Sequence, residues 1–336
     1  MIRFLDIYDV SALIRAIGIE DVLAQLADYI SKDYRRWIEF DKAARHASHS
    51  ALGVIELMPI SDQKLYSFKY VNGHPGNTSK GLPNIVAFGV LADVETGIPL
   101  LISEFTVATA LRTAATSALA AKYMARSGSK TMAVIGCGAQ SEFQILAFKK
   151  VLGIKHVRAF DIRPEVIKKL CRNLAGADLE ISVSGSIAEA VKGADIVTTL
   201  TAAKSKQAIL TISMIEEGMH LNAVGGDCPG KTELDAEIVR RARVVVEYAP
   251  QTRIEGEIQQ MPPEFPVIEL WELLTRTKVA RENDKQITIF DAVGFALEDF
   301  ATLRYFNDMS LKYKIGSPIG LIPNFGDPRD LYSLLA

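Results

Sequence analysis

The segment from residue 130 to residue 144, Lys-Thr-Met-Ala-Val-Ile-Gly-Cys-Gly-Ala-Gln-Ser-Glu-Phe-Gln, constrains the fold more than any other part of the chain. A short apolar run, Met132–Ile135, leads into a turn with Gly136 and Gly138, and a helical pattern follows. Gly136 permits the tight turn, and Gly138 lets a pyrophosphate approach the amides that open the helix. Ser141 stands where such turns more often have Gly or Ala, but it is still small enough for close helix–strand packing. The segment predicts a dinucleotide-binding βαβ unit, with an ordinary strand–helix turn as the alternative.

A second strand-like run indicates which dinucleotide would bind. His156–Phe160 ends at Asp161, about 20 residues beyond the turn, where the acid that binds a ribose is expected. A carboxylate at this point accepts hydrogen bonds from the adenosine ribose and repels a 2′-phosphate. Arg163 follows and could offset that repulsion. The pattern favours NAD over NADP.

Length and composition exclude several classes of protein. At 336 residues the chain is long for one core, so two domains are expected. The formal net charge of −2 provides no electrostatic footprint for nucleic acid. The cysteines, Cys137, Cys171 and Cys228, have no metal-ligand spacing, so we predict no metal site and a reducing, cytoplasmic setting. Two cations interrupt the apolar stretch Val107–Ala125, so no membrane span is expected.

From Lys130 to Leu303, strand-like and helix-like runs alternate, which predicts an α/β domain with a parallel, doubly wound sheet. The clearest helical patterns are Pro164–Leu174 and Ser186–Val191. The predicted strands are Met132–Ile135, Val157–Phe160, Ile196–Leu200, His220–Val224, Val244–Glu247 and Ile287–Phe290.

The N-terminal part has a different pattern, in which one helix, Leu13–Phe40, precedes several strands. The last two strands flank a turn with Gly97 and predict an antiparallel hairpin. A helix at Thr109–Met124 would join this strand-rich lobe to the α/β part, and we expect the tail after Lys314, including Asp330–Leu335, to pack back on the first lobe. The predicted strands are Gly53–Met58, Leu65–Val71, Ile85–Val94 and Leu100–Phe105.

Three cations lie where cations are costly. Lys69 has aromatic neighbours, Arg112 interrupts a helix rich in Ala and Thr, and Arg45 comes just before a strand. A buried cation needs an anion, and Arg offers a carboxylate two parallel hydrogen bonds. If the three cations converge, they would form a site for a carboxylate or a pyrophosphate. The alternative for each is a solvent-facing position or a structural salt bridge.

Two acids are candidates for proton transfer. Asp227 follows a predicted strand and Gly225-Gly226, at the carboxyl edge where doubly wound sheets bind ligands. It could act as a general base or hold an ammonium group, or it could simply cap the next helix. Glu56 stands within an apolar strand, where a lone acid is more often exposed than catalytic.

With these residues laid out, the chain resembles the ornithine cyclodeaminase/μ-crystallin family over essentially its whole length. The resemblance implies a Rossmann domain at 116–311 and a substrate-binding lobe at 1–115 with 312–336, which also forms a homodimer interface. The segments that carry it are Ala44–Ser50, Val54–Pro59, Phe68–Pro75, Ala108–Ala115, Gly138–Gln144, His220–Leu234 and Val293–Asp299.

The resemblance also implies roles for individual residues. Arg45, Lys69 and Arg112 match anchors of the substrate carboxylate, Asp227 matches the catalytic acid, and Glu56 matches an acid near the reacting carbon. Val293 matches a substrate contact, and Arg112 also matches a contact to the cofactor phosphates. Asn84 replaces the threonine of close relatives, which puts that cofactor contact in doubt. Together with the turn glycines Gly136 and Gly138, the cofactor contacts are Ala139, Gln140, Asp161, Thr201, Asn222, Ala223, Val224, Lys231 and Ala292.

The reaction that the resemblance implies converts L-ornithine to L-proline and ammonia, with NAD recycled within one turnover. Hydride leaves Cα, the δ-amine attacks the resulting imine, ammonia is lost, and the hydride returns. Three alternatives remain: a lysine cyclodeaminase, an imine reductase or amino-acid dehydrogenase, and a non-catalytic binding protein. A one-methylene difference between substrates is discriminated by only ~10–200-fold.

Overall fold

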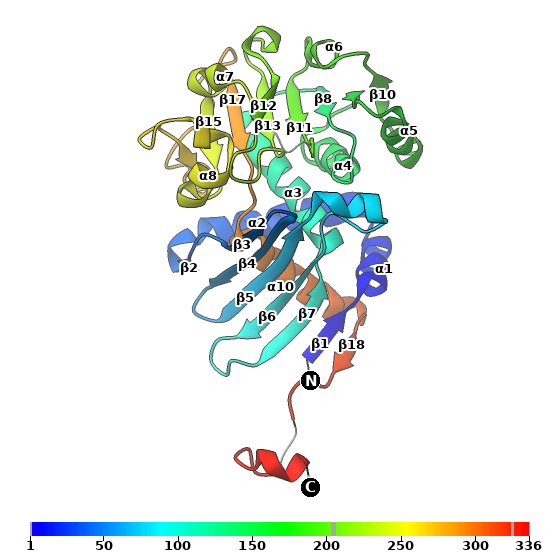
Figure 1. Cartoon of the computed structure of the whole chain (residues 1–336), viewed down its shortest axis with the longest axis vertical. Helices are drawn as coiled ribbons and strands as arrows, with labels where there is room; N and C mark the ends of the chain where they lie inside the picture. Colours follow the sequence, from blue (N-terminus) through cyan, green and yellow to red (C-terminus); the bar gives the residue numbers. More distant parts are fainter. Residues whose placement is uncertain (1, 203–205, 324–325, 336) are drawn as a thin grey trace.

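The computed structural model describes residues 2–202, 206–323 and 326–335. Figure 1 shows two lobes joined by helix α3 (Thr106–Met124), which lies where they meet. A strand-rich lobe comes from the N-terminal part, and an α/β lobe comes from the middle of the chain. No helix in these residues is both long and apolar enough to cross a bilayer.

The first lobe is built on a mostly antiparallel sheet in the order β18-β1-β7-β6-β5-β4-β2, with β3 paired to β4. The hairpin predicted around Gly97 is confirmed, because β6 and β7 pair antiparallel there. The strands are β1 (Ile2–Leu5), β2 (Asp41–Lys42), β3 (His46–Ser50), β4 (Gly53–Ser61), β5 (Leu65–Gly73), β6 (Ala87–Asp93), β7 (Pro99–Glu104) and β18 (Ser317–Ile319).

The single helix predicted at Leu13–Phe40 is wrong in its extent. The chain instead forms α1 (Ile7–Ile17) and α2 (Ile19–Arg35), separated at Gly18, and a short turn η1 (Trp37–Glu39) follows. Asp6 begins α1 with a capping box, in which its carboxylate accepts hydrogen bonds from the first turn. The apolar periodicity runs through both helices, so it did not reveal the break between them.

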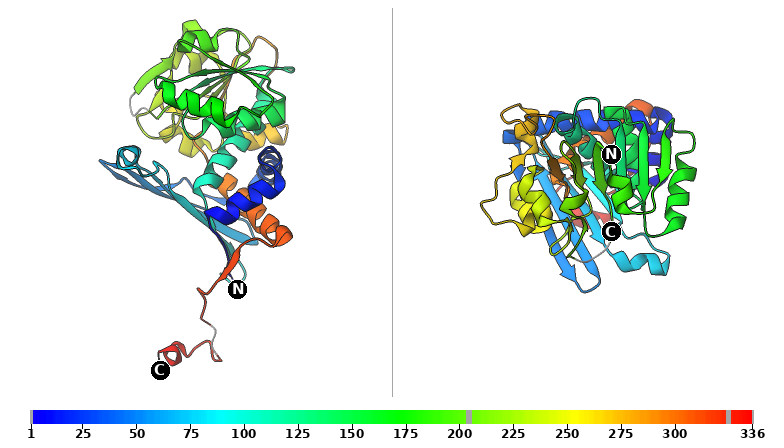
Figure 2. Two further views of the ribbon diagram at one scale, coloured as in Figure 1. Left: turned by 90° about the vertical axis from the view of Figure 1, so that its right-hand side faces the viewer. Right: turned by 90° about the horizontal axis from the view of Figure 1, so that it is seen from above.

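Helices cover one face of the first sheet and leave the other bare, as the left view of Figure 2 shows. Alternation along β4 and β5 turns Met58 and Lys69 toward the covered face, where both are buried. Large apolar side chains on the bare face are exposed to solvent. They include Ile55, Leu57, Tyr66, Phe88 and Leu100.

The second lobe confirms the predicted doubly wound α/β fold. The eight strands of its main sheet are all parallel, in the order β10-β9-β8-β11-β13-β17-β15-β16, and the order reverses between β8 and β11. Ligands bind such sheets at this reversal, beyond the carboxyl ends of the strands. The strands are β8 (Thr131–Ile135), β9 (His156–Phe160), β10 (Glu180–Val183), β11 (Ile196–Thr199), β13 (His220–Ala223), β15 (Arg243–Val246), β16 (Ile268–Glu269) and β17 (Thr288–Asp291).

Helices and short turns surround this sheet, and a separate two-stranded parallel sheet pairs β12 (Lys206–Leu210) with β14 (Thr232–Leu234). The two-stranded sheet and the edge strands β10 and β16 were not predicted. The helices and turns of this lobe are α4 (Ser141–Leu152), α5 (Pro164–Asn173), α6 (Ile187–Val191), α7 (Ala236–Arg241), α8 (Ala249–Glu255), α9 (Leu270–Leu274), η3 (Ile212–Met214) and η4 (Glu257–Gln260), whereas η2 (Pro75–Lys80) belongs to the first lobe.

The chain returns to the first lobe through α10 (Ala296–Tyr313), which packs against α2 and against β4, β5 and β6. The predicted domain limits, 1–115 with 312–336 and 116–311, stay a prediction. The contacts of α10 favour an earlier return to the first lobe than residue 312.

The expected docking of the tail is confirmed only for β18, which pairs with β1. The last turn, η5 (Leu331–Leu334), projects away from the body in Figure 1, and its apolar side chains are exposed. The prediction is therefore wrong for Asp330–Leu335.

Candidate active site between the lobes

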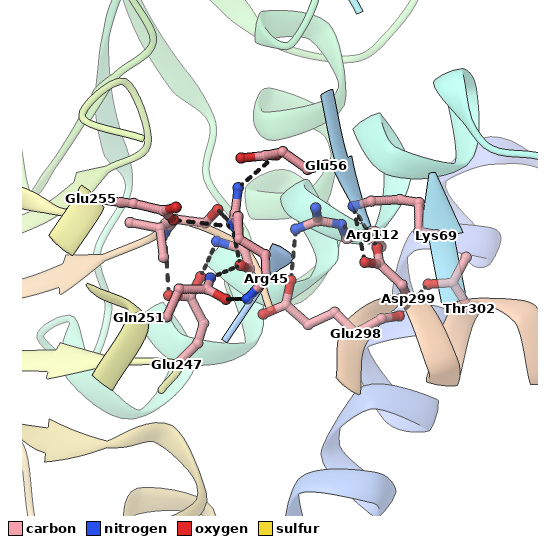
Figure 3. Close-up of polar contacts among 12 residues, drawn as sticks. Arg45, Glu56, Lys69, Arg112, Glu247, Gln251, Glu255, Glu298, Asp299 and Thr302 are labelled. Atoms are coloured by element: carbon pink, nitrogen blue, oxygen red, sulfur yellow. Dashed lines mark hydrogen bonds and ion pairs between the residues drawn. The ribbon is translucent and has the colours of Figure 1, made fainter. Parts of the chain in front are cut away.

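The three cations at sites where burial is costly, Arg45, Lys69 and Arg112, converge between the two lobes (Figure 3). Lys69 comes from β5, Arg112 from α3, and Arg45 from the segment between β2 and β3. The positive charges of Arg112 and Arg45 both reach Lys69. The convergence that sequence spacing left open is therefore present, and all three side chains are at most 8% exposed.

Lys69 and Arg112 share carboxylates that α10 supplies. The Nζ of Lys69 lies 2.9 Å from Oδ2 of Asp299 and donates a hydrogen bond of 3.0 Å to Oδ1. Arg112 donates to Glu298 at 2.7 Å, and its Nε lies 3.1 Å from Asp299. Burial and the charge of Arg112 lower the pKa of Lys69 to about 8, and burial raises the pKa of Glu298. These four groups form a charge network with almost no access to water.

The network still has donors for an incoming anion. Among the described residues, the ammonium group of Lys69 has one carboxylate partner for its three N–H groups. Arg112 uses Nη1 and Nε in its ion pairs, which leaves Nη2 without a carboxylate partner in the described part of the chain. The structural salt bridge and the substrate anchor, which the sequence offered as alternatives, are therefore compatible.

Arg45 joins the two lobes. Its Nη1 donates to Glu56 on β4 at 3.1 Å, and its Nη2 donates to the carbonyls of Val293 and Gly294 at 2.6 and 2.7 Å. Its Nε lies 3.2 Å from Oε2 of Glu255, the last residue of α8. Glu56 is thus buried against a cation, and the more common exposed position of a lone strand acid does not apply to it.

The backbone at residues 293–294 fits closely around these cations. Gly294 has a φ of +79°, and a Cβ there would lie 2.4 Å from Nη1 of Arg112, so a larger residue would displace the guanidinium. Glu247 accepts the backbone N–H of Val293 at 3.2 Å and that of Gly294 at 2.9 Å. Burial, and then the charge of Glu298, raise the pKa of Glu247 to about 8.

The glycine turn after β8 has the geometry of an anion site at the start of a helix. Gly136 has a φ of +98°, and a Cβ there would lie 2.9 Å from the carbonyl carbon and oxygen of Leu200. A Cβ at Gly138 would meet no atom within 4 Å, so the space over the turn is open. The carboxylate of Asp161 accepts the N–H of Cys137 at 2.8 Å and that of Arg163 at 2.9 Å, which fixes it beside the turn.

The neighbouring residues of the turn fit a bound ligand as well. Ala139 is exposed, and Oε1 of Gln140 is buried without a hydrogen-bond partner among the described residues. A buried acceptor without a partner is costly, and a ligand donor would satisfy it.

A second set of predicted residues lies at the carboxyl ends of β11 and β13. Lys231 donates to the carbonyl of Thr201 at 2.9 Å, and its Nζ lies 3.4 Å from Oδ1 of Asp227. The carboxylate of Glu233 accepts the N–H of Thr201 at 3.1 Å. The side chain of Asp227 is 52% exposed, so this acid, unlike Glu56, faces open space.

The other residues that were predicted to contact the cofactor lie in different surroundings. Ala223 and Ala292 end or follow strands at the same sheet edge, and Val224 is partly buried there. Asn222 is fully buried, and its amide lies within 3.2 Å of Gln144 and 3.3 Å of Thr198, so its side chain supports the interior.

Asn84 belongs to the first lobe, between η2 and β6. In the orientation that satisfies its hydrogen bonds, its side-chain nitrogen donates to the carbonyls of His74 and Pro75 at 3.3 and 3.1 Å. These hydrogen bonds stabilise the loop that contains Asn84.

The sequence reasoning missed every acid that pairs with the cations except Glu56. A signal was present in Glu298-Asp299, two adjacent acids in an otherwise apolar helix start, Phe295-Ala-Leu-Glu-Asp-Phe300. For Glu255 the sequence offered no comparable signal. Gln251, whose Oε1 accepts the backbone N–H of Arg45 at 3.1 Å, also had none.

Residues 9–314 match the model of the ornithine cyclodeaminase/mu-crystallin family. The chain is 53% identical to ornithine cyclodeaminase of Brucella suis biovar 1 (strain 1330) over 335 residues, which covers 100% of this chain and 94% of that protein.

Solved structures are similar over nearly the same length. A lysine cyclodeaminase, whose structures address recognition of L-lysine, L-ornithine and L-2,4-diaminobutyric acid, superposes with a TM-score of 0.94 at 27% identity, covering 99% of both chains. An archaeal alanine dehydrogenase dimer with bound NAD has a TM-score of 0.87 at 32% identity, covering 96% of this chain and 99% of that one.

Proposed function

Because this chain belongs to the ornithine cyclodeaminase/μ-crystallin family, we propose that it is an ornithine cyclodeaminase, an NAD-dependent enzyme that converts L-ornithine to L-proline and ammonia. The observation that carries the proposal is 53% identity to an ornithine cyclodeaminase over the whole chain. The cluster of Arg45, Lys69 and Arg112 supports it, since an amino-acid carboxylate needs such a site.

The cofactor is NAD, which the archaeal alanine dehydrogenase holds in its solved structure. The open turn at Gly136–Gln140 and the fixed carboxylate of Asp161 fit a pyrophosphate and a ribose. When bound, NAD supplies the chemistry of hydride removal and return. We propose that NAD also contacts Thr201, Lys231 and the residues at the ends of β13 and β17.

The protein's own groups then hold the substrate and move protons. We assign the α-carboxylate to the spare donors of Lys69 and Arg112, which would fix the α-carbon for hydride transfer. Asp227 would take a proton from the δ-ammonium at its carboxylate, because only the neutral amine can attack the α-carbon. Attack closes a five-membered ring, the α-nitrogen leaves as ammonia, and reduction of the ring imine gives proline. Glu56 would hold a water or an amino group near that carbon.

A homodimer is part of the proposal. The bare face of the first sheet carries Tyr70 and Phe88, whose rings stack at 5.2 Å, and Phe88 lies 6.4 Å from Phe68. Monomers rarely expose a contiguous apolar surface of this kind. The exposed Leu331, Tyr332, Leu334 and Leu335 of the tail would gain a surface to cover if a second copy packed there. The archaeal relative is a dimer. A cytoplasmic location stays a prediction from the cysteine content.

The test is incubation of the protein with L-ornithine and a catalytic amount of NAD, followed by assays of proline and ammonia. We expect equal amounts of both products and no net accumulation of reduced NAD. Accumulation of reduced NAD in step with turnover would overturn the proposal in favour of an amino-acid dehydrogenase.

A lysine cyclodeaminase is the second candidate, because of the high structural similarity to an enzyme of that activity. The same assay with L-lysine separates the two. We expect lysine to be the poorer substrate, since one extra methylene costs roughly 10–200-fold in discrimination. A higher kcat/KM with lysine would reverse the assignment.

A further inference from the structure

Glu255 lies on the opposite side of the site from Asp299 (Figure 3), and one of its carboxylate oxygens is unsatisfied. Its side chain is 7% exposed. Oε2 lies 3.2 Å from Nε of Arg45, but the alignment is too poor for a hydrogen bond, and neither atom has another hydrogen-bond partner among the described residues. Leaving a buried carboxylate oxygen without a donor is costly. A ligand with N–H groups would remove that cost.

The side chains around Glu255 carry an excess of negative charge, which favours the binding of a cation. Arg45 is shared between Glu255 and Glu56, and its remaining contacts are neutral carbonyls. Asp227 adds a third carboxylate whose charge reaches Glu255. Burial raises the pKa of Glu255 to about 7; Arg45 opposes the shift, whereas Glu56 and Asp227 increase it. Among these groups, three carboxylates are matched by two cations, Arg45 and Lys231, the second of which lies 3.4 Å from Asp227. One negative charge is left over, so a further positive group would be stabilised there.

The other end of the site has the opposite preference. Lys69 and Arg112 have spare donors there, which suits a carboxylate. A molecule that carries an anion at one end and an ammonium group at the other would complement both ends. An amino acid with a second, distal amino group has this charge pattern.

We propose that Glu255 determines substrate specificity by binding the distal ammonium group of an α,ω-diamino acid, and so favours such substrates over amino acids with one amino group. The inference rests on the proposed function and adds a residue to it. Glu255 holds the ammonium group from the α8 side, while Asp227 remains the acid that removes its proton. Glu56 stays on Arg45 at 3.1 Å and keeps the guanidinium in place.

The experiment compares two ligands that differ only in the distal amino group. L-Ornithine is measured as substrate, and L-norvaline, which has the same carbon skeleton without the δ-amine, is measured as a competitive inhibitor. Glu255→Gln keeps the size of the side chain and removes its charge. We expect kcat/KM for ornithine to fall roughly ten- to hundredfold, as for a lost charge-assisted hydrogen bond. The inhibition constant of norvaline should change by less than about threefold.

Two outcomes would overturn the inference. Equal weakening of ornithine and norvaline would mean that Glu255 acts only by positioning Arg45. Unchanged ornithine kinetics would mean that the distal ammonium group is held elsewhere. Glu255→Asp provides a second variant in case the Gln variant folds poorly. It keeps the charge on a shorter side chain, and we expect it to retain more ornithine selectivity than Gln.

Glu237→Gln is the matched control, because Glu237 belongs to the same lobe, has a side chain that is 37% exposed, and pairs only with surface arginines among the described residues. It should leave both constants at their wild-type values. Failure of the proposed function looks different, since the unsubstituted protein would then form no proline from ornithine.

Discussion

Two pairs of buried acids in this protein are neutralised in different ways. Glu298 and Asp299 on α10 face cations at 2.7–3.1 Å. Glu257, below Gly226 in the turn after β13, and Asp291, at the end of β17, accept hydrogen bonds only from amide groups in the described structure. The donors are backbone N–H groups at 2.7–3.1 Å and, for Glu257, the side-chain amide of Gln260 at 3.3 Å. Burial raises the pKa of Asp291 to about 7, and burial with the charge of Asp291 raises that of Glu257 to about 8.

This difference in partners distinguishes acids that belong to a charged binding site from acids that only support the fold. Acids held by amides can take up a proton near neutral pH without disturbing a salt bridge, so they suit a purely structural position. Acids held by cations keep charges fixed in a region of low water access, where each charge acts strongly on a ligand. We infer that the cations facing Glu298 and Asp299 serve the recognition of a charged substrate.

The largest expected effect is that of Arg112→Met. The substitution removes the cation but leaves Glu298 buried, so we expect a loss of about 3–5 kcal/mol of stability as well as loss of turnover. Urea unfolding followed by circular dichroism measures the loss. Arg240→Met, which breaks an exposed ion pair, is the control and should cost at most about 1 kcal/mol. A cost no greater than the control's would show that the pairing is not needed for folding.

Asp227→Asn should affect the reaction and spare the fold. The side chain is half-exposed, so unfolding should be unchanged, whereas loss of the base should lower kcat by about two to four decades. Proline formation and fluorescence titration with NAD together measure this. Near-normal turnover would exclude Asp227 as the base and direct attention to Glu56.

A substitution at Asp161 tests whether an acid that accepts hydrogen bonds from backbone amides always has a purely structural role. It accepts two backbone N–H groups, as Glu257 does, yet it lies beside the open turn. Asp161→Ala should reduce the preference for NAD over NADP by roughly tenfold or more, because repulsion of the 2′-phosphate disappears. The two dissociation constants are measured for both proteins. An unchanged ratio would assign Asp161 to the scaffold.

The smallest effect concerns pH. The folded-state pKa values of Glu257 and Asp291 lie above their ordinary values of 4.5 and 3.8, so the folded protein binds these protons more tightly than the unfolded chain. Their contribution to stability is therefore lost as pH rises from about 4 to about 8. Glu257→Gln should reduce the fall between about pH 6 and about pH 8.5 by on the order of 1 kcal/mol. Urea midpoints at both pH values test the sign, and an unaltered slope in the variant would contradict it.

The α/β lobe was predictable because its signals are local. The glycine turn and Asp161 lie within one βαβ unit, and periodicity located six of the eight strands of the main sheet. The partners of the cations were not predictable in this way. Lys69 and Asp299 are 230 residues apart, and no local pattern links them.

Two other predictions from the sequence were wrong for similar physical reasons. The break at Gly18 leaves the apolar stripe intact, so periodicity did not reveal it. The last turn of the tail has apolar residues but no surface of its own lobe to cover, and sequence alone does not say which chain it would meet. Site residues whose position depends on one element, such as Asp227 beyond β13, were easier to anticipate than those that depend on two.

The polypeptide passes between the lobes twice, once along α3 and once through residues 292–295, and each passage contributes directly to the site. Neither passage is a passive linker. Exchange of whole lobes between relatives, in evolution or in engineered chimaeras, would therefore have to transfer Arg112 and Gly294 together, because each occupies space defined by the other. A recombination point inside either passage would produce a folded pair of lobes with a misshapen centre.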